Sequence, residues 1–478
     1  MVAVQALATL PGTCAQGKCA PDLLSKSCVL YNTAEHPCDG GEFLNVIIPD
    51  VRRRYITIFI LGGVGFCLLC GLVYNLPPIH DQLAWRVDNI RVTIKRFFNP
   101  PEQVVFVPQD QVDAIVQATL TALAPAPTST AILLTETPVP IPSTTPTSIP
   151  DQAALIGIRH EYQQFNNCAP ASLSMVLSYW GWQRSQYETR AYLRPGFEVD
   201  DKNVNAFEIV EYVENYTEFD ALWRVGGDLG MLKRLTAAGF PVLIEKGLHH
   251  HDDAWLGHYQ IISGYNDANN SFLVYDSYEG LPEAYPVSYD VIAQFWRHFN
   301  FTYVVVFPSE RAAEVASILG PQSDPVQNFR SAAELALAET ASQIGREQFF
   351  AWFNRGTNLV HLQDYAGAAQ AYDSAFAIYA ALPLEERPWR LLWYQDGPYA
   401  AYYYTGRYQD VINLAHTALV NVDKPVLEET YYWRGMAKAA LGDHAGAVED
   451  LTRAFTLNPN STPAGEELQR INSTSTSP

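Results

Sequence analysis

The most apolar stretch of the chain covers residues 55–74 and contains no charged side chain. Its twenty residues would rise about 30 Å as a helix, which is enough to cross the hydrocarbon core of a membrane. The stretch also lacks the polar stripe that a helix on the surface of a soluble domain would show. We therefore predict one N-terminal transmembrane helix over residues 55–76, preceded by a segment of residues 1–54.

The segments that flank this stretch predict its orientation. Three arginines at residues 52–54 precede it and favour a cytoplasmic N-terminus, although basic residues beyond the stretch reduce the asymmetry. Residues 124–150 are rich in proline, threonine and serine, a composition that cannot bury a core and stays extended. Such stalks usually hold a domain away from the outer face of a membrane. We expect a single-pass protein of the cell membrane, with a juxtamembrane segment and stalk over residues 77–150 and extracytoplasmic C-terminal domains.

After residue 150 the periodicity becomes that of a mixed globular domain. A helical spacing of apolar residues follows Cys168 and ends at Gly181. Three apolar runs further along then predict strands, and the polar residues 266–270 predict a turn between the last two. The predicted strands cover residues 240–245, 257–265 and 271–278. Together these elements predict an α+β domain over residues 151–310.

Helical periodicity with many alanines dominates the last part of the chain. Three small or aromatic residues each precede an aromatic residue or a histidine by nine positions. These pairs are Gly356 with Tyr365, Tyr399 with Tyr408, and Gly435 with His444. The pattern resembles tetratricopeptide repeats, in which small residues let paired helices approach closely. We predict an all-α tetratricopeptide-like repeat domain over residues 346–465 that binds a peptide or protein partner, with an ordinary helical bundle as the alternative.

Shorter segments surround these repeats. A connecting helical segment is predicted over residues 311–345, between the α+β domain and the first repeat. An insertion around residues 383–390, which contains Pro383 and Pro388, separates the first two predicted repeats. The polar residues 466–478 predict a disordered tail.

Composition and charge narrow the classes of partner. The hydrophobic share is 48% and the charged share 17%, which are ordinary for globular protein and exclude a wholly disordered chain. The net charge is −20, and such a surface repels the phosphate backbone of nucleic acids. We therefore expect no nucleic-acid partner.

The seven cysteines are distributed unevenly along the chain. Those outside the C-terminal part are Cys14, Cys19, Cys28 and Cys38 before the apolar stretch, and Cys67 and Cys70 within it. The first four lack the close pairs typical of zinc sites, so unpaired thiols are favoured over zinc ligands. Cys168 alone belongs to the C-terminal part, where a thiol without a disulfide partner is either buried and inert or kept for chemistry.

The residues around Cys168 favour chemistry. Because the predicted helix begins here, its dipole and the unpaired amides of its first turn would stabilise a thiolate and lower the pKa of Cys168. Pro170 suits the first turn, where a missing N–H costs nothing. Gln163 and Gln164 precede the cysteine by five and four residues, and either side-chain amide can donate to a developing oxyanion.

A thiolate nucleophile also needs a base and a group that orients the base. His258 lies near the start of one predicted strand, and Asp276 lies near the end of the next. Two adjacent antiparallel strands bring such positions side by side. The sequence thus predicts a site that contains Cys168, His258 and Asp276.

Residues 249–253, which read His-His-His-Asp-Asp, offer a second kind of chemistry. They are predicted to lie in a loop between two strands. Three adjacent histidines on one short loop do not easily face a single ion, so a solvated loop is favoured over a metal site. We expect neither a metal nor another cofactor.

Three short sequence boxes resemble those of a known family. They are Asn-Cys168-Ala-Pro-Ala-Ser, Gly-His258-Tyr-Gln-Ile-Ile-Ser-Gly-Tyr and Val-Tyr-Asp276-Ser-Tyr. In this order they resemble the Cys, His and Asp boxes of the C39-like peptidases, which are papain-like and related to the proteolytic domains of bacteriocin exporters. The resemblance spans residues 156–308. It implies a bacterial α+β papain-like cysteine peptidase domain, followed here by the all-α repeats.

The resemblance also implies a role for each site residue. Cys168 would be the nucleophile, His258 the base, Asp276 the group that orients the base, and a glutamine before the cysteine the oxyanion donor. Tyr162 stands where the family's glutamine often lies, and Gln163 is preferred over Gln164 as the donor. Ala169 replaces the glycine that usually follows the cysteine, and its methyl group would narrow the approach to the thiolate.

Two functions from different classes follow. The first is a membrane-anchored extracytoplasmic peptidase that hydrolyses peptide bonds, with the repeats recruiting a substrate or partner. The alternative is a catalytically inactive papain-like module that binds peptides while the repeats act as an interaction scaffold. Ala169 is the sequence feature that favours the alternative. Acyl transfer to an amine instead of water would use the same residues as hydrolysis.

Overall fold

The computed structural model describes residues 50–74, 76, 87, 90, 94, 105–109, 149–195, 203–249, 255–278, 282–420 and 426–475. The chain divides into two compact units, Met1–Leu69 and Cys70–Pro478. Several residues that were assigned roles lie outside the described ranges, and these assignments stay predictions. They are Cys14, Cys19, Cys28, Cys38 and residues 250–253.

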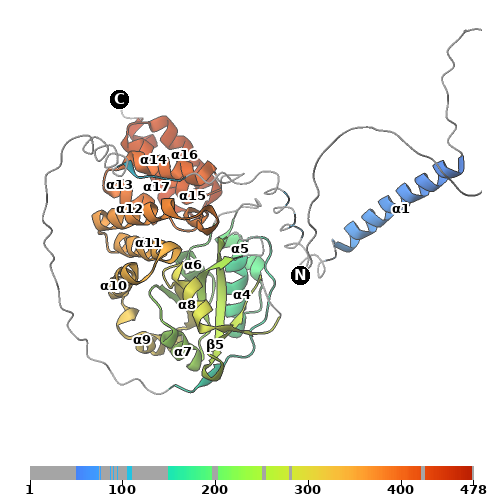
Figure 1. Ribbon diagram of the computed structural model, residues 1–478, viewed down its shortest axis with the longest axis horizontal. Helices are drawn as coiled ribbons and strands as arrows, with labels where there is room; N and C mark the ends of the chain where they lie inside the picture. The colour runs from blue at the N-terminus through green and yellow to red at the C-terminus, as the bar shows by residue number, and fades with distance from the viewer. Residues whose placement is uncertain are drawn as a thin grey trace, which may run out of the picture. The chain divides into compact units, whose positions relative to one another are not determined.

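The helix predicted at the apolar stretch is present as α1 (Asp50–Tyr74; Figure 1). It begins before that stretch and includes the arginines at residues 52–54. In the part of the chain that the structure describes, no helix is both long and apolar enough to cross a membrane. The prediction of a transmembrane helix over residues 55–76 is therefore not supported.

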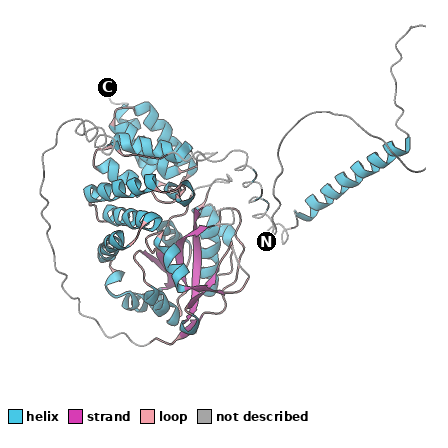
Figure 2. Cartoon of the chain, in the orientation of Figure 1, coloured by secondary structure: helices cyan, strands magenta, loops and turns pink. Residues whose placement is uncertain are grey.

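One antiparallel sheet forms the centre of the α+β domain (Figure 2). Among the described residues it has seven strands in the order β2-β7-β3-β4-β5-β6, with β1 paired to β4. The strands are β1 (Gln152–Ala154), β2 (Phe219–Arg224), β3 (Val242–His249), β4 (Trp255–Asn266), β5 (Ser271–Tyr275), β6 (Tyr285–Ser288) and β7 (Tyr303–Pro308). The long strand β4 pairs with β3, β5 and β1, so it lies inside the sheet.

Helices cover both faces of this sheet. The first layer contains α4 (Cys168–Tyr179), α5 (Gln186–Leu193) and α6 (Ala206–Tyr216); the second contains α7 (Leu229–Ala237), α8 (Tyr289–Arg297) and α9 (Ala312–Leu319). Each layer has its own hydrophobic core. Along β3, Leu243 packs in the first core, whereas Val242 and Ile244 pack in the second. This alternation is the two-residue period of a strand, and it explains why both faces of the central strands are apolar.

The C-terminal region is helical, as predicted. It contains α10 (Pro325–Ser342), α11 (Gly345–His361), α12 (Tyr365–Ala381), α13 (Gly397–Tyr404), α14 (Tyr408–Val420), α15 (Glu428–Ala440), α16 (His444–Leu457) and α17 (Thr462–Ser475). The predicted anchors lie where paired helices touch. A Cβ atom at Gly356 would lie 2.7 Å from Cζ of Tyr372 on the partner helix, so glycine permits this approach.

The prediction of a disordered tail over residues 466–478 is wrong as far as Ser475. These residues continue helix α17, which begins at Thr462. Ile471 is 2% exposed and packs against Ala447 and Leu451 of α16. A single buried face is enough to order the segment, since a final helix covers the apolar side of the last repeat.

The α+β domain and the helical region share a hydrophobic core. Trp255 at the start of β4 and Phe299 after α8 belong to the same cluster as Phe350 of α11, with Trp255 and Phe299 stacked at 5.7 Å. Two buried amides, Asn300 and Asn358, exchange hydrogen bonds of 2.7 and 3.1 Å across the contact. The helical region is therefore packed against the domain that carries the candidate site.

Candidate active site

Cys168 is the first residue of α4, as the sequence predicts. Asn167 precedes the helix but does not cap it with its side chain. Instead, Nδ2 of the Asn167 side chain donates to Oε1 of Gln186 at 2.7 Å, and Oδ1 accepts from Arg194 at 3.3 Å. The first N–H groups of a helix have no partner within it, so this end of α4 presents positive charge to the cysteine.

His258 and Asp276 lie side by side, at the positions that the strand pattern predicts. Nε2 of His258 contacts both carboxylate oxygens of Asp276 at 3.0 Å. The antiparallel register pairs Ile261 of β4 with Tyr275 of β5, and Asp276 follows directly. Both side chains are buried, with exposures of 2% and 1%. Because Nε2 faces Asp276, Nδ1 is the ring nitrogen left for the hydrogen bond that His258 shares with Cys168.

Two further groups hold the Asp276 carboxylate. The side-chain amide of Gln260 donates to Oδ2, and the backbone N–H of Tyr278 donates to Oδ1, each at 2.8 Å. Gln260 lies two residues after His258, and therefore on the same side of β4. These donors fix the orientation of a carboxylate that in turn fixes the imidazole.

The two candidate oxyanion donors have different surroundings. The side chain of Gln163 is buried, and its Oε1 accepts a hydrogen bond of 2.9 Å from the hydroxyl of Ser277. Its backbone N–H also donates to the Ser277 carbonyl at 2.9 Å. Oε1 of Gln164 instead accepts from Arg190 of α5 at 3.1 Å. Since Ser277 follows Asp276 directly, Gln163 is the glutamine tied to the residues that orient the base.

The surrounding charges favour the ionised forms of Cys168 and His258. Burial raises the pKa of Cys168, but the hydrogen bond and charge of His258, the backbone of Tyr259 and the charge of Arg194 together hold it below its usual value. Burial disfavours a charged imidazole, yet the charge and hydrogen bond of Asp276, together with Cys168, raise the pKa of His258 well above its usual value. Both shifts favour an ion pair of a Cys168 thiolate and a His258 imidazolium.

A buried carboxyl group also lies close to the cysteine. Glu245 of β3 is 7% exposed and stands opposite Tyr259 of β4. Burial and, to a lesser extent, the charge of Cys168 raise the pKa of Glu245 to about 8, against the opposing effect of a hydrogen bond from Tyr259. Glu245 is therefore mostly neutral at pH 7 and adds little negative charge beside the thiolate.

The methyl group of Ala169 packs into the protein interior. Ala169 is 2% exposed and belongs to the same apolar cluster as Leu173 and Val176 of α4. Cys168 itself is only partly buried. The replacement of glycine by alanine at residue 169 therefore fills space in the core of the first helical layer.

The predicted loop of histidines begins differently from the expectation. His249 is the last residue of β3, and its Nε2 accepts a hydrogen bond of 2.7 Å from Arg346. This ring nitrogen is engaged because β3 extends four residues beyond the predicted strand. Within the described ranges, no group of three histidine, cysteine, aspartate or glutamate side chains could hold a metal ion.

The family model of the Peptidase C39 like family matches residues 155–304. The domain resembles the C39-like peptidases. A tetratricopeptide repeat model matches residues 428–461, which include α15 and α16. No curated protein matches the chain.

Among solved structures, one similar chain is described as a C39-like peptidase from Bacillus anthracis. It shares 13% sequence identity with this chain, and the alignment covers 32% of this chain and 96% of that one with a TM-score of 0.26. The domain that matches the family model is a mixed α+β domain, and a helical region with a tetratricopeptide repeat follows it.

Three polar residues of the C39-like domain were not predicted from the sequence. Gln260 contacts Asp276, and Ser277 contacts Gln163. The buried Arg194 donates a hydrogen bond of 3.0 Å to the backbone carbonyl of Phe165, in the loop before Cys168. The spacing of Gln260 from His258 is a signal that could have found it, since both lie on one side of a strand. Arg194 has no local signal, because its contacts are with residues nearly thirty positions earlier.

Proposed function

We propose that the C39-like domain is a cysteine peptidase that hydrolyses peptide bonds. The observation that carries the proposal is the continuous contact from Cys168 through His258 to Asp276. A thiol at a helix N-terminus, a buried imidazole and a carboxylate held by two other donors form the arrangement that activates a sulfur nucleophile.

Each group has a role in this mechanism. The Cys168 thiolate attacks the carbonyl carbon, and the resulting oxyanion accepts hydrogen bonds from the Gln163 amide and the Cys168 backbone N–H. The His258 imidazolium then gives its proton to the leaving amine, and the C–N bond breaks to leave a thioester on Cys168. A water molecule gives a proton to His258 and attacks this thioester, which releases the acid and restores the thiolate.

A selective alkylation experiment tests this proposal. The full chain is treated with iodoacetamide at pH 6, and each cysteine is followed by mass spectrometry. We expect Cys168 to react faster than Cys67 and Cys70, which are exposed thiols on α1. Alkylation should stop at this position in Cys168→Ser and slow by at least about 100-fold in His258→Ala, since a positioned base contributes on the order of 100-fold or more.

Equal, slow labelling of Cys168 in the wild type and in His258→Ala would contradict the proposal. The alternative function would then apply, in which the papain-like domain binds peptides without cleaving them. The packing of Ala169 in the core supports the peptidase proposal over this alternative. The repeats, which share a core with the domain, would bind a peptide or protein partner in either case.

The location of the protein is a separate proposal that rests on the sequence alone. We propose a membrane-anchored protein with a cytoplasmic N-terminus and extracytoplasmic C-terminal domains, because of the uncharged residues 55–74 and the Pro/Thr-rich residues 124–150. Extraction of cell membranes with alkaline carbonate should leave the full chain in the pellet. Its C-terminal domains should be cleaved by protease added outside intact spheroplasts. Release into the carbonate supernatant would refute the anchor.

A further inference from the structure

A short segment from the N-terminal half of the chain is bound by the helical region. Residues 105–109 read Val-Phe-Val-Pro-Gln. Phe106 is 5% exposed and Pro108 is also buried, whereas Val107 is 38% exposed and Gln109 is exposed. Alternate residues therefore face the helices, which is how an extended peptide presents its side chains to a binding surface.

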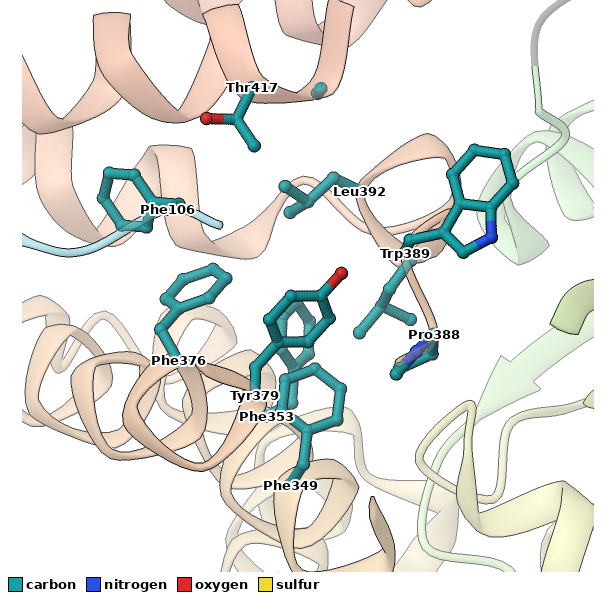
Figure 3. Close-up of a pocket in the computed structure, with 11 residues that line it drawn as sticks. Phe106, Phe349, Phe353, Phe376, Tyr379, Pro388, Trp389, Leu392 and Thr417 are labelled. Atoms are coloured by element: carbon teal, nitrogen blue, oxygen red, sulfur yellow. The ribbon is translucent and has the colours of Figure 1, made fainter. Parts of the chain in front are cut away.

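The ring of Phe106 enters a pocket of aromatic side chains. It contacts Phe376 of α12 edge-on at 5.0 Å and Tyr402 of α13 at 6.0 Å. Figure 3 shows Phe106 on one side of this pocket, beside Phe376 and Thr417. A buried aromatic ring in an apolar pocket is the kind of contact that dominates peptide affinity.

The backbone of the segment is bound as well. The N–H of Gln109 donates to Oδ1 of Asp410 at 2.9 Å. Asp410 is 2% exposed, and its Oδ2 accepts from Nε of Arg407 at 2.8 Å. The buried Asp410 carboxylate, which Arg407 holds in place, thus accepts a hydrogen bond from the backbone three residues after Phe106. Such a contact is independent of the side chain at that position.

Phe106 leaves part of the pocket unfilled. The pocket has about 420 Å³ of empty space, some of it open to solvent. Its far side is formed by Pro388, Trp389 and Leu392, which belong to the insertion between α12 and α13 (Figure 3). The side chains that line this space are mostly apolar.

We propose that this pocket is a binding site for extended apolar peptides, and that residues 105–109 are its exchangeable internal occupant. The incoming partner has an aromatic residue that takes the place of Phe106 beside Phe376 and Tyr402. Residues 110–148 connect the occupant to the domain. A tethered segment competes at an effective concentration on the order of millimolar, so an outside peptide binds weakly until the segment is displaced. The inference does not depend on peptidase activity.

The test measures binding of a fluorescein-labelled peptide with the sequence of residues 103–110 to the full chain, by fluorescence anisotropy. Phe106→Ala weakens the internal competitor, and we expect its affinity for the peptide to be at least tenfold higher than that of the wild type. Val107→Ala is the matched control, because this neighbouring side chain is exposed. It should bind like the wild type. Equal affinity of Phe106→Ala and the wild type would mean that the segment is a fixed part of the fold, and would overturn the proposal.

Two further measurements locate the binding. An unlabelled peptide in which alanine replaces the phenylalanine should fail to compete, since the pocket reads that ring. The double variant Phe106→Ala/Asp410→Ala should bind the labelled peptide at least tenfold more weakly than Phe106→Ala alone. Competition by the alanine peptide, or unchanged binding to the double variant, would overturn the proposed site. If Phe106→Ala does not fold by circular dichroism, Phe106→Leu replaces it, with an expected gain of at least threefold.

Discussion

Two buried histidines of this molecule each contact a carboxylate, and the pKa of one is raised while that of the other is lowered. His258 contacts Asp276 beside the cysteine, and His298, after α8, contacts Glu347 of α11 at 3.2 Å. Both rings are almost inaccessible to solvent. Burial alone would favour the neutral form of each.

The difference comes from what else each ring and carboxylate contacts. Nδ1 of His298 accepts a hydrogen bond of 3.0 Å from the indole of Trp255, which fixes a neutral ring. Glu347 also contacts Arg297 and Arg346, so its charge is shared among cations. Burial lowers the pKa of His298 to about 4, with the charges of Arg346 and His249 acting in the same direction and Glu347 opposing them.

At the candidate site the balance is reversed. Asp276 receives neutral donors from Gln260 and the Tyr278 backbone, so its full charge acts on His258. The other side of the ring faces Cys168, whose thiolate adds a second negative charge. A histidine–carboxylate contact is therefore not evidence of a base by itself. The neighbours of the carboxylate decide whether the ring is charged.

The largest expected effect tests this comparison directly. His258→Ala should reduce the acylation of Cys168 by p-nitrophenyl acetate by roughly 100- to 10,000-fold, because the base is lost. His298→Ala should leave the same rate within about twofold, since His298 contacts the repeats and not Cys168. Release of p-nitrophenol measures both. A comparable loss in His298→Ala would show that the two histidines do not have separate roles.

A smaller effect concerns stability in acid. The folded pKa of His298, about 4, lies below the ordinary value of 6.5, so the unfolded chain binds a proton that the folded chain does not. The resulting stability is complete above pH 6.5 and is lost as the pH falls toward 4. It amounts to about 3 kcal/mol. Urea unfolding should show that the free energy of unfolding of the wild type falls between pH 6.5 and pH 4. In His298→Gln this fall should be smaller by up to about 3 kcal/mol. Parallel losses in the two proteins would contradict a buried neutral His298.

The smallest effect extends the comparison to the residue after Asp276. Ser277→Ala removes the hydrogen bond that orients Gln163, so acylation by p-nitrophenyl acetate, which forms an oxyanion, should fall about fivefold. Alkylation by iodoacetamide forms no oxyanion and should not change. Ser277→Thr keeps a hydroxyl and should restore acylation. If both reactions fell equally in Ser277→Ala, the serine would support the fold and not the oxyanion donor.

The sequence predicted the parts of the site that depend on local pattern. Helical periodicity after Cys168 placed the thiol at a helix start, and two alternating runs around a turn brought His258 and Asp276 together. The preference for Gln163 over Gln164 came from a resemblance, and only the contacts with Ser277 and Arg190 separate their surroundings in the fold. The contact of Gln260 with Asp276 could be predicted only with knowledge of which side of β4 faces Asp276.

Longer-range features were not predictable from local pattern. The helical residues 466–475 look polar and short, and they are ordered only because Ile471 reaches the core of the preceding helix pair. The binding of Phe106 by α12 and α13 joins segments separated by some 270 positions. Periodicity carries no information about such contacts, since either segment alone has several ways to bury its apolar side chains.

The shared core has a consequence for how this protein can be divided. A chain that ended at residue 310 would keep Cys168, His258 and Asp276, yet it would expose the ring of Trp255, which now packs on Phe350, and the ring of Phe299, which packs on Tyr394. Trp255 opens the strand that carries His258 three residues later. The excised domain would thus expose aromatic side chains to solvent, and it would hold His258 less firmly. We expect such a domain to aggregate or to lose the reactivity of Cys168. A transfer of the α+β domain into another protein therefore has to include at least α10 and α11.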